Sequence, residues 1–154
     1  MRKIISAAVL AVVGLFGVPA IAANDSTSVT VNITLTSKCV FGAVAPVVFA
    51  YSSFQAAAAT ATGGTFNMKC TNTMPYSIGF TNAASPAATD AVTDDAVNLA
   101  YSLGLSATTG TGNGSDQAYT VTGSMALGQA GTCLTASCTN IAATNKTRTL
   151  YVVY

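Results

Sequence analysis

Residues 28–36 have the sequence SVTVNITLT, in which apolar and polar side chains alternate without a break. The apolar residues, which would all point to one side of an extended chain, are Val29, Val31, Ile33 and Leu35. A period of two with β-branched residues on both faces is typical of a strand and not of a helix. The sequence therefore predicts a β-strand near the amino terminus.

The same period of two returns along the rest of the chain. The intervening stretches 82–95, 108–115 and 128–143 are rich in residues that favour turns and are predicted to be loops. The run of four alanines at 56–59 is too short to form a stable helix. The strands that the alternation predicts cover residues 28–36, 44–51, 64–70, 76–80, 97–105, 118–125 and 148–154. Seven short strands at this spacing predict an all-β antiparallel sandwich.

The first residues have the order of features found in a secretory signal. Arg2 and Lys3 precede an uncharged apolar stretch, and small residues follow it up to Ala23. We predict that residues 1–22 are a cleaved signal peptide, with cleavage after Ala22 or, alternatively, after Ala23. Residues 23–154 would then form a single domain of ordinary size. The alternative, a retained membrane helix, fits less well because a polar run follows the apolar stretch.

The composition excludes several classes of function. The chain has no His, its five acidic residues are all Asp, and only 7% of its residues are charged. Without His or Glu, the usual general acids and bases are missing, so we predict that the protein is not an enzyme. A formal net charge of +1 gives no field to hold a phosphate backbone, so we predict no nucleic-acid partner. We also predict no cofactor.

Four cysteines, Cys39, Cys70, Cys133 and Cys138, follow the predicted signal. An even number of cysteines in an exported chain indicates disulfide bonds, and four cysteines allow three pairings. We favour Cys39–Cys70 with Cys133–Cys138, because the second pair is close in sequence on a loop. A zinc site is disfavoured because the chain has no His and a single closely spaced cysteine pair.

Two other groups of residues suggest ligand sites only at first sight. Residues 109–114 alternate Gly with Thr and Asn, but they lack a phosphate-loop motif, and a hairpin tip is the better interpretation. Asp90, Asp94 and Asp95 lie close together in the sequence. Calcium would need more oxygen ligands at fixed spacing, so we predict a solvated turn there.

The two ends of the chain suggest a different kind of site. The predicted last strand places Leu150, Val152 and Tyr154 on one face, and it would leave an exposed sheet edge. The alternating segment 28–36 could cover such an edge in a neighbouring molecule by β-strand addition. Equally, residues 28–36 could be the first strand of their own domain. The alternation alone does not separate these two hypotheses.

Several segments resemble one known family. The Val-x-Val-x-Ile-x-Leu row followed by Ser37-Lys38-Cys39 is similar to the start of spore coat protein U domains, a family that includes the major subunits of archaic chaperone–usher pili. Residues 131–140, which contain Cys133 and Cys138, depart from the pattern of that family. The other segments that resemble it are 65–71, 75–80, 98–103, 120–125 and 149–154.

The resemblance implies an incomplete immunoglobulin-like antiparallel β-sandwich that lacks its last strand and is completed by donor-strand exchange. It implies that residues 24–36 are the donor segment, with Val29, Val31, Ile33 and Leu35 as its apolar row. It also implies that Leu150, Val152 and Tyr154 lie on the edge strand of the acceptor groove. The Cys39–Cys70 bond would match the disulfide of the family.

The function that follows from the resemblance is structural. We expect a subunit of an extracellular fimbria, exported through the periplasm to the cell surface. Its expected partners are copies of itself or other pilus subunits, a periplasmic chaperone and an outer-membrane usher. The alternative is an exported, self-complete β-sandwich that acts as an adhesin or a glycan-binding module.

Overall fold

The computed structural model describes residues 24–154, so the predicted signal peptide, with its cleavage site after Ala22 or Ala23, lies outside the described residues. Residues 35–154 form one unit, and residues 24–34 fall in a separate one. No helix in residues 24–154 has the length and apolar character needed to span a bilayer.

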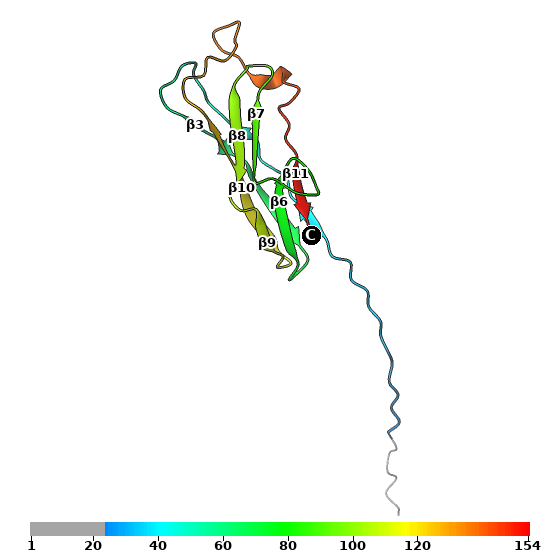
Figure 1. Cartoon of the computed structure of the whole chain (residues 1–154). Helices are drawn as coiled ribbons and strands as arrows, with labels where there is room; N and C mark the ends of the chain where they lie inside the picture. Colours follow the sequence, from blue (N-terminus) through cyan, green and yellow to red (C-terminus); the bar gives the residue numbers. More distant parts are fainter. Residues whose placement is uncertain (1–23) are drawn as a thin grey trace, which may run out of the picture. The chain divides into compact units, whose positions relative to one another are not determined.

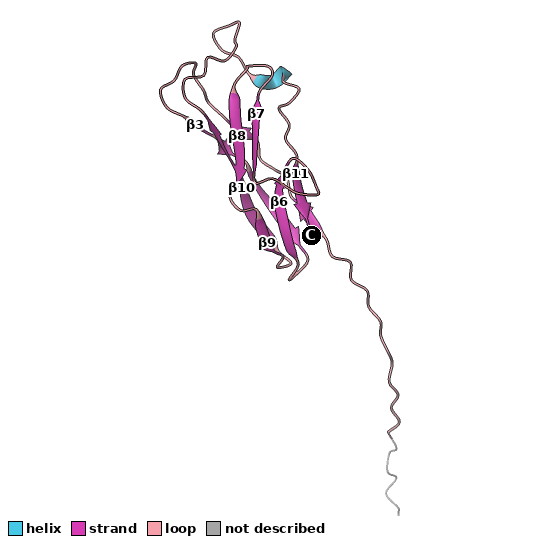
Figure 2. Cartoon of the chain, viewed as in Figure 1, coloured by secondary structure: helices cyan, strands magenta, loops and turns pink. Residues whose placement is uncertain are grey.

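The described chain is built from β-strands, as Figure 2 shows, and its one helical element is the short 3₁₀-helix η1, Asn140–Ala142. The predicted all-β antiparallel sandwich is therefore confirmed. The strands are β1 (Cys39–Phe41), β2 (Val47–Val48), β3 (Ala59–Thr60), β4 (Thr62–Gly63), β5 (Thr65–Cys70), β6 (Pro75–Phe80), β7 (Thr89–Thr93), β8 (Ala100–Leu105), β9 (Thr109–Thr111), β10 (Asp116–Met125) and β11 (Leu150–Val153).

The strands form two main sheets (Figure 1). The larger has the order β1-β5-β10-β8-β7, and β3 pairs with β10 beyond the end of β5. The smaller has the order β11-β6-β9, and β2 and β4 form a separate short pair. Every one of these pairings is antiparallel.

The core consists of the inward side chains of both sheets. In β5, the buried residues Phe66, Met68 and Cys70 alternate with exposed ones, as the period of two predicts. Phe66 stacks on Tyr119 of β10, with ring centroids 5.5 Å apart. The hydroxyls of Tyr119 and Tyr76 are hydrogen-bonded to each other, and burial raises the pKa of Tyr119 to about 12.

The structure contains two disulfide bonds. Cys39 lies directly opposite Cys70 in the β1–β5 ladder, and their Cα atoms are 4.1 Å apart. Cys133 and Cys138, with Cα atoms 5.7 Å apart, close a small loop between β10 and η1. The first bond therefore joins neighbouring strands, whereas the second restrains a loop.

The prediction of a strand at residues 28–36 was wrong for the chain taken by itself. No strand is assigned in residues 24–38, and the first strand of the described chain begins at Cys39. Alternation shows that a segment has one apolar and one polar face, but a strand also needs a neighbouring backbone as its hydrogen-bonding partner. Residues 28–36 have no such partner within the described chain.

Two segments predicted to be loops contain strands. β7 lies within residues 82–95, where Asp90 interrupts the apolar pattern but is neutralised by a partner described below. β9 lies within residues 108–115, where a hairpin tip was predicted. Its Gly110 pairs with Tyr76 and has no room for a side chain, because a Cβ atom there would collide with the Tyr76 ring.

Other predicted strands are shorter in the structure. Only Val47–Val48 of residues 44–51 is a strand, because Pro46 has no N–H to donate to a ladder. β8 begins at Ala100 and not at Val97, since residues 94–97 form a turn around the side chain of Asp94. β11 covers the middle of residues 148–154.

The strand registers define the two ends of the sandwich. Cys39 lies opposite Cys70, just before the turn that leads to β6, and Val153 lies opposite Ser77 near the start of β6. The first residues of β1 and the carboxyl terminus therefore share one end, which we call the C-terminal end. Leu150 lies toward the opposite end, which we call the loop end and which carries η1 (Figure 1).

Candidate functional site: an apolar groove beside the last strand

Like the outer strands β7 and β9, two segments that border one groove form strand pairs along one side only. β11 pairs with β6, and no strand of the described chain pairs with its other edge. Residues 39–48 bond to β4 and β5, and the N–H of Ala45 donates to the carbonyl of Thr65 at 2.9 Å. Both edges thus keep free N–H and C=O groups, the arrangement to which a further strand can add.

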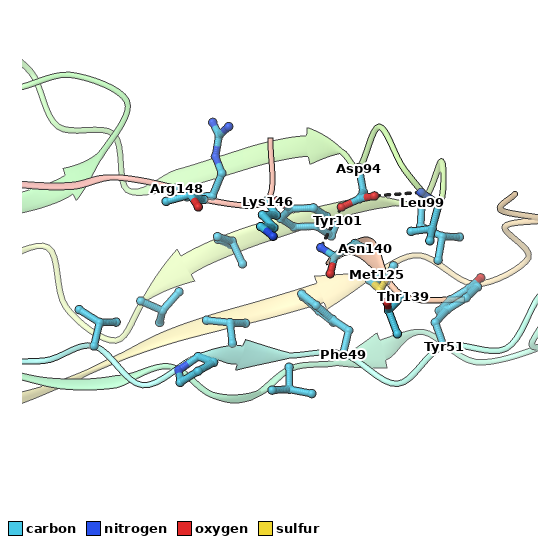
Figure 3. Close-up of a pocket in the computed structure, with 18 of the residues that line it drawn as sticks. Phe49, Tyr51, Asp94, Leu99, Tyr101, Met125, Thr139, Asn140, Lys146 and Arg148 are labelled. Carbon is cyan, nitrogen blue, oxygen red and sulfur yellow. Dashed lines mark hydrogen bonds between the residues drawn. The ribbon is translucent and has the colours of Figure 1, made fainter. Parts of the chain in front are cut away.

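A groove of about 680 Å³ lies beside these two edges. Figure 3 shows Phe49 and Tyr51 on one side of it and Lys146 and Arg148, which lead into β11, on the other. Its lining is mostly apolar. The apolar residues that line it include Val44, Val47, Phe49, Tyr51, Phe80, Val97, Leu99, Tyr101, Leu103, Val121, Met125 and Leu150.

The groove reaches the hydrophobic core of the sandwich. Phe80, Leu103 and Val121 belong to the core and also line the groove. Phe49 and Tyr101 pack against that core, with ring centroids 5.7 Å apart, but both stay partly exposed. This part of the core thus lacks the cover that another strand would give in a closed sandwich.

Asp94 organises the polar end of the groove. One carboxylate oxygen accepts hydrogen bonds from the N–H groups of Ala96 and Val97, both at 3.0 Å. The other accepts from Nδ2 of Asn140 at 2.9 Å (Figure 3). Because Asp94 is only 2% exposed, these bonds replace the water that a carboxylate otherwise needs.

Asp90, which lies opposite Leu103 in the β7–β8 pair, binds the segment before β11 farther along, at Arg148. Nε of Arg148 donates to its Oδ2 at 2.6 Å, and Nη2 donates to its Oδ1 at 3.1 Å. The hydrogen bond that Arg148 donates to this carboxylate raises the pKa of the guanidinium. The predicted solvated turn is therefore wrong for Asp90 and Asp94, which are both buried. Their partners lie more than 40 residues later, so local sequence could not reveal them.

Asp95 remains exposed and supplies the third anchor. It accepts hydrogen bonds from the N–H of Thr144, at 3.0 and 3.2 Å, and from the hydroxyl of Thr144. The hydroxyl bond holds the pKa of Asp95 below its ordinary value. Together, the three aspartates, which lie in or just after β7, hold residues 140–148, the segment that leads into β11.

The comparison with known families identifies the fold family. The model of the Spore Coat Protein U domain matches residues 25–153. The chain belongs to the Spore Coat Protein U domain family. No curated protein and no solved structure matches the chain significantly.

The family is one of structural pilus and coat proteins and not of enzymes, and its members are extracellular or surface-associated. Membership supports a general role as a pilus-type subunit. The two disulfide bonds are consistent with an exported protein. In the part of the chain that the structure describes, no three His, Cys, Asp or Glu residues are placed to hold a metal ion.

The residues proposed for the last edge strand occupy different positions in this Spore Coat Protein U domain. Leu150 lines the groove, and Leu150 and Val152 pack against the core. Tyr154 follows the end of β11 and is exposed. The four apolar residues of the donor row, Val29, Val31, Ile33 and Leu35, are between 73% and 86% exposed.

Sequence analysis missed most of the groove lining. Phe49 and Tyr51 lie in the strand predicted at residues 44–51, but no role in a site was predicted for them, and Asn140 lies in a predicted loop. Tyr101 and Leu103 belong to the strand predicted for residues 97–105. The apolar row of that strand was the one feature of the sequence that indicated part of the groove lining.

Proposed function

We propose that this Spore Coat Protein U domain is a structural subunit of an extracellular fimbria, assembled by a chaperone–usher pathway through donor-strand complementation. Residues 24–36 of one copy would add a strand to the groove of another copy. Export through the periplasm, a periplasmic chaperone and an outer-membrane usher belong to this proposal. The observation that carries it is an uncovered groove and an unpaired, alternating apolar segment in the same chain.

The chemistry of the segment matches that of the groove. Val29, Val31, Ile33 and Leu35 would enter the apolar lining, while the Thr and Asn residues between them would face water. Burial of four aliphatic side chains contributes about 6–12 kcal/mol before the cost of ordering the segment. Backbone hydrogen bonds to the free edge of β11 would add to this.

The direction of the added strand favours a second copy over self-closure. An immunoglobulin-like sandwich that ends at β11 lacks the strand that would pair with β11 in the antiparallel direction. Because every strand pair of the described chain is antiparallel, we expect the added strand to be antiparallel to β11 as well. Because β11 runs toward the C-terminal end, a strand antiparallel to it finishes at the loop end.

The segment of the same copy cannot reach that position. Lys38 is fixed at the C-terminal end, where its N–H donates to the hydroxyl of Thr71 at 2.9 Å and its carbonyl accepts from the N–H of Thr71 at 2.9 Å. Leu35 is three residues away from Lys38, a reach of about 11 Å at full extension. This is too short to place Leu35 at the opposite end of the sandwich, which supports another copy as the source of the antiparallel strand.

Deletion of residues 24–36 tests the proposal in the exported chain with its chaperone. The truncated subunit should keep its groove and still bind the chaperone, but it should form no filaments in electron micrographs or size-exclusion profiles. Filaments that persist after this deletion would show that the donor assignment is wrong.

A second variant separates loss of the donor from loss of the fold. Residues 24–36 are moved behind Tyr154 through a short turn, so that the segment can fill the groove of its own copy antiparallel to β11. This chain should be monomeric and should unfold at a clearly higher denaturant concentration than the deletion variant. Its matched control carries Ile33→Asp in the moved segment and should lose that gain, because a carboxylate would enter an apolar groove.

A further inference from the structure

The short connection before β1 constrains how two copies would lie in a filament. This step rests on the proposed function. When the donor strand ends at the loop end of one copy, Lys38 of the donating copy lies within about 11 Å of Leu35. Lys38 is itself bonded to Thr71 at the C-terminal end of its own domain. The C-terminal end of one copy must therefore lie next to the loop end of the other.

The loop end carries large apolar side chains that the core does not use. Leu134 is 98% exposed and Ile141 is 77% exposed, and both follow β10. Phe54 and Leu127 are also exposed at this end, where the N–H of Phe54 donates to the carbonyl of Gln129 at 2.9 Å. Four large apolar side chains are therefore exposed near the end of the domain that the short connection would bring next to a second copy.

Several features restrain the backbone that carries these side chains. The Cys133–Cys138 bond closes the loop that carries Leu134. Nζ of Lys146 donates to the carbonyl of Ile141 at 2.6 Å. Phe54 has a φ angle of 61°, in the left-handed region that bulky residues seldom adopt. A surface that is arranged before binding loses little conformational entropy when it binds.

The C-terminal end offers matching apolar surface. Val40, next to Cys39 in β1, is exposed, and so are Val153 and Tyr154 at the end of the chain. Some exposed large apolar residues neither line the groove nor belong to the donor row. All of them lie at the two ends of the domain that the short connection would bring together.

We propose that the loop-end surface, formed by Phe54, Leu127, Leu134 and Ile141, is the docking site for the C-terminal end of a second copy of this chain. The donor strand links the two copies, and this second contact fixes the angle between them. The disulfide-closed loop at residues 133–138 is the central part of the docking site.

A photo-crosslinking amino acid at Leu134 tests this contact in filaments of the otherwise unchanged chain. Because Leu134 is almost fully exposed, its replacement should not affect folding. We expect adducts in the filaments with peptides that contain Val40 or Tyr154, and no such adducts in the monomer whose groove is filled by its own moved segment. The matched control places the probe at Thr122, which is exposed on β10 away from both ends, and should give no adduct with those peptides.

A second variant checks that the apolar surfaces cause the contact. Exchange of Val40 and Tyr154 for Ser removes exposed apolar groups and should lower the adduct yield from Leu134 about tenfold. Filaments that form while the Leu134 probe reacts elsewhere, or not at all, would overturn the docking site alone. Failure of the unchanged chain to form filaments would overturn the proposed function, and the docking site with it.

Discussion

Residues 28–36 and strand β5 have the same pattern and opposite environments. Both alternate apolar and polar residues, yet the apolar row of β5 is buried and the apolar row of residues 28–36 is exposed. The difference lies in the neighbours, since β5 pairs with β1 on one side and β10 on the other, whereas residues 28–36 pair with no strand in the described chain. The alternating pattern shows that a segment has an apolar face that can be buried in a sheet. The topology decides whether its own chain supplies the neighbouring strands for that sheet.

The largest expected effect comes from a comparison of two isoleucines, one from each of these environments. Ile78 in β6 is 1% exposed and Ile33 is 86% exposed. Ile78→Ala should lower the free energy of unfolding of the subunit by about 2–5 kcal/mol, because it leaves a cavity in the core. Ile33→Ala should leave that free energy within about 0.5 kcal/mol.

Urea unfolding of monomeric subunits with an empty groove measures both values. The same two substitutions in filaments provide the control, since Ile33→Ala should there weaken the contact between subunits. Equal effects of the two substitutions on the monomer would contradict the view that residues 28–36 contribute nothing to the fold of their own copy.

The two disulfide bonds allow a test in which the expected change in the free energy of unfolding is of intermediate size. The Cys39–Cys70 bond joins β1 to β5 in the core, whereas the Cys133–Cys138 bond closes an exposed loop. Replacement of Cys39 and Cys70 by Ala should cost about 3.7 kcal/mol from loop-closure entropy, and replacement of Cys133 and Cys138 about 2 kcal/mol. Chemical unfolding of the two double variants measures this order. A larger loss from the second pair would mean that the loop supports more of the fold than its exposure suggests.

The smallest expected effect concerns Asp95, which helps to anchor the segment before β11. Its pKa is held below the ordinary value of 3.8, chiefly by the hydroxyl of Thr144. A lowered pKa in the folded state contributes stability above about pH 4, and this contribution is lost as the pH falls through the folded pKa. Asp95→Asn should therefore make the loss of stability in acid slightly less steep.

Unfolding midpoints measured between pH 2 and pH 6 check this change, with Asp116→Asn as an exposed control outside the anchor. The effect should be small, because the Asp95 carboxylate is open to solvent. An unchanged acid profile would mean that Thr144 has no measurable influence on this carboxylate.

Sequence was sufficient for the parts of the fold in which local pattern and burial agree. β5, β6 and β10 were predicted because apolar residues recur at every second position, and β11 because it is a run of β-branched and aromatic residues. β7 was missed because Asp90 lies where an apolar residue was expected, and its partner Arg148 belongs to a distant segment. β9 was missed because it contains Gly110, a residue that is typical of turns. The Tyr76 ring lies where a Cβ atom of residue 110 would be, and this contact between strands is not visible in the sequence.

The candidate site was predictable only in part, for a similar reason. The resemblance to the family implied that Leu150 lies beside the groove, and it does line the groove. The opposite side, with Phe49 and Tyr51, was predicted only as part of a strand at residues 44–51, and the pattern did not show that these rings would line a groove. The polar end depends on pairs such as Asp94 with Asn140, which are 46 residues apart, so only the folded chain reveals it.

The position of the Cys39–Cys70 bond has a mechanical consequence. A pulling force on residues 24–36 enters the domain through Lys38 at Cys39, which forms the first pair of the β1–β5 ladder with Cys70. Hydrogen bonds between antiparallel strands that are loaded at one end break one after another, starting from that end. Here the first rung is covalent, so tension would pass directly into β5, inside the larger sheet, and β1 could not be peeled away.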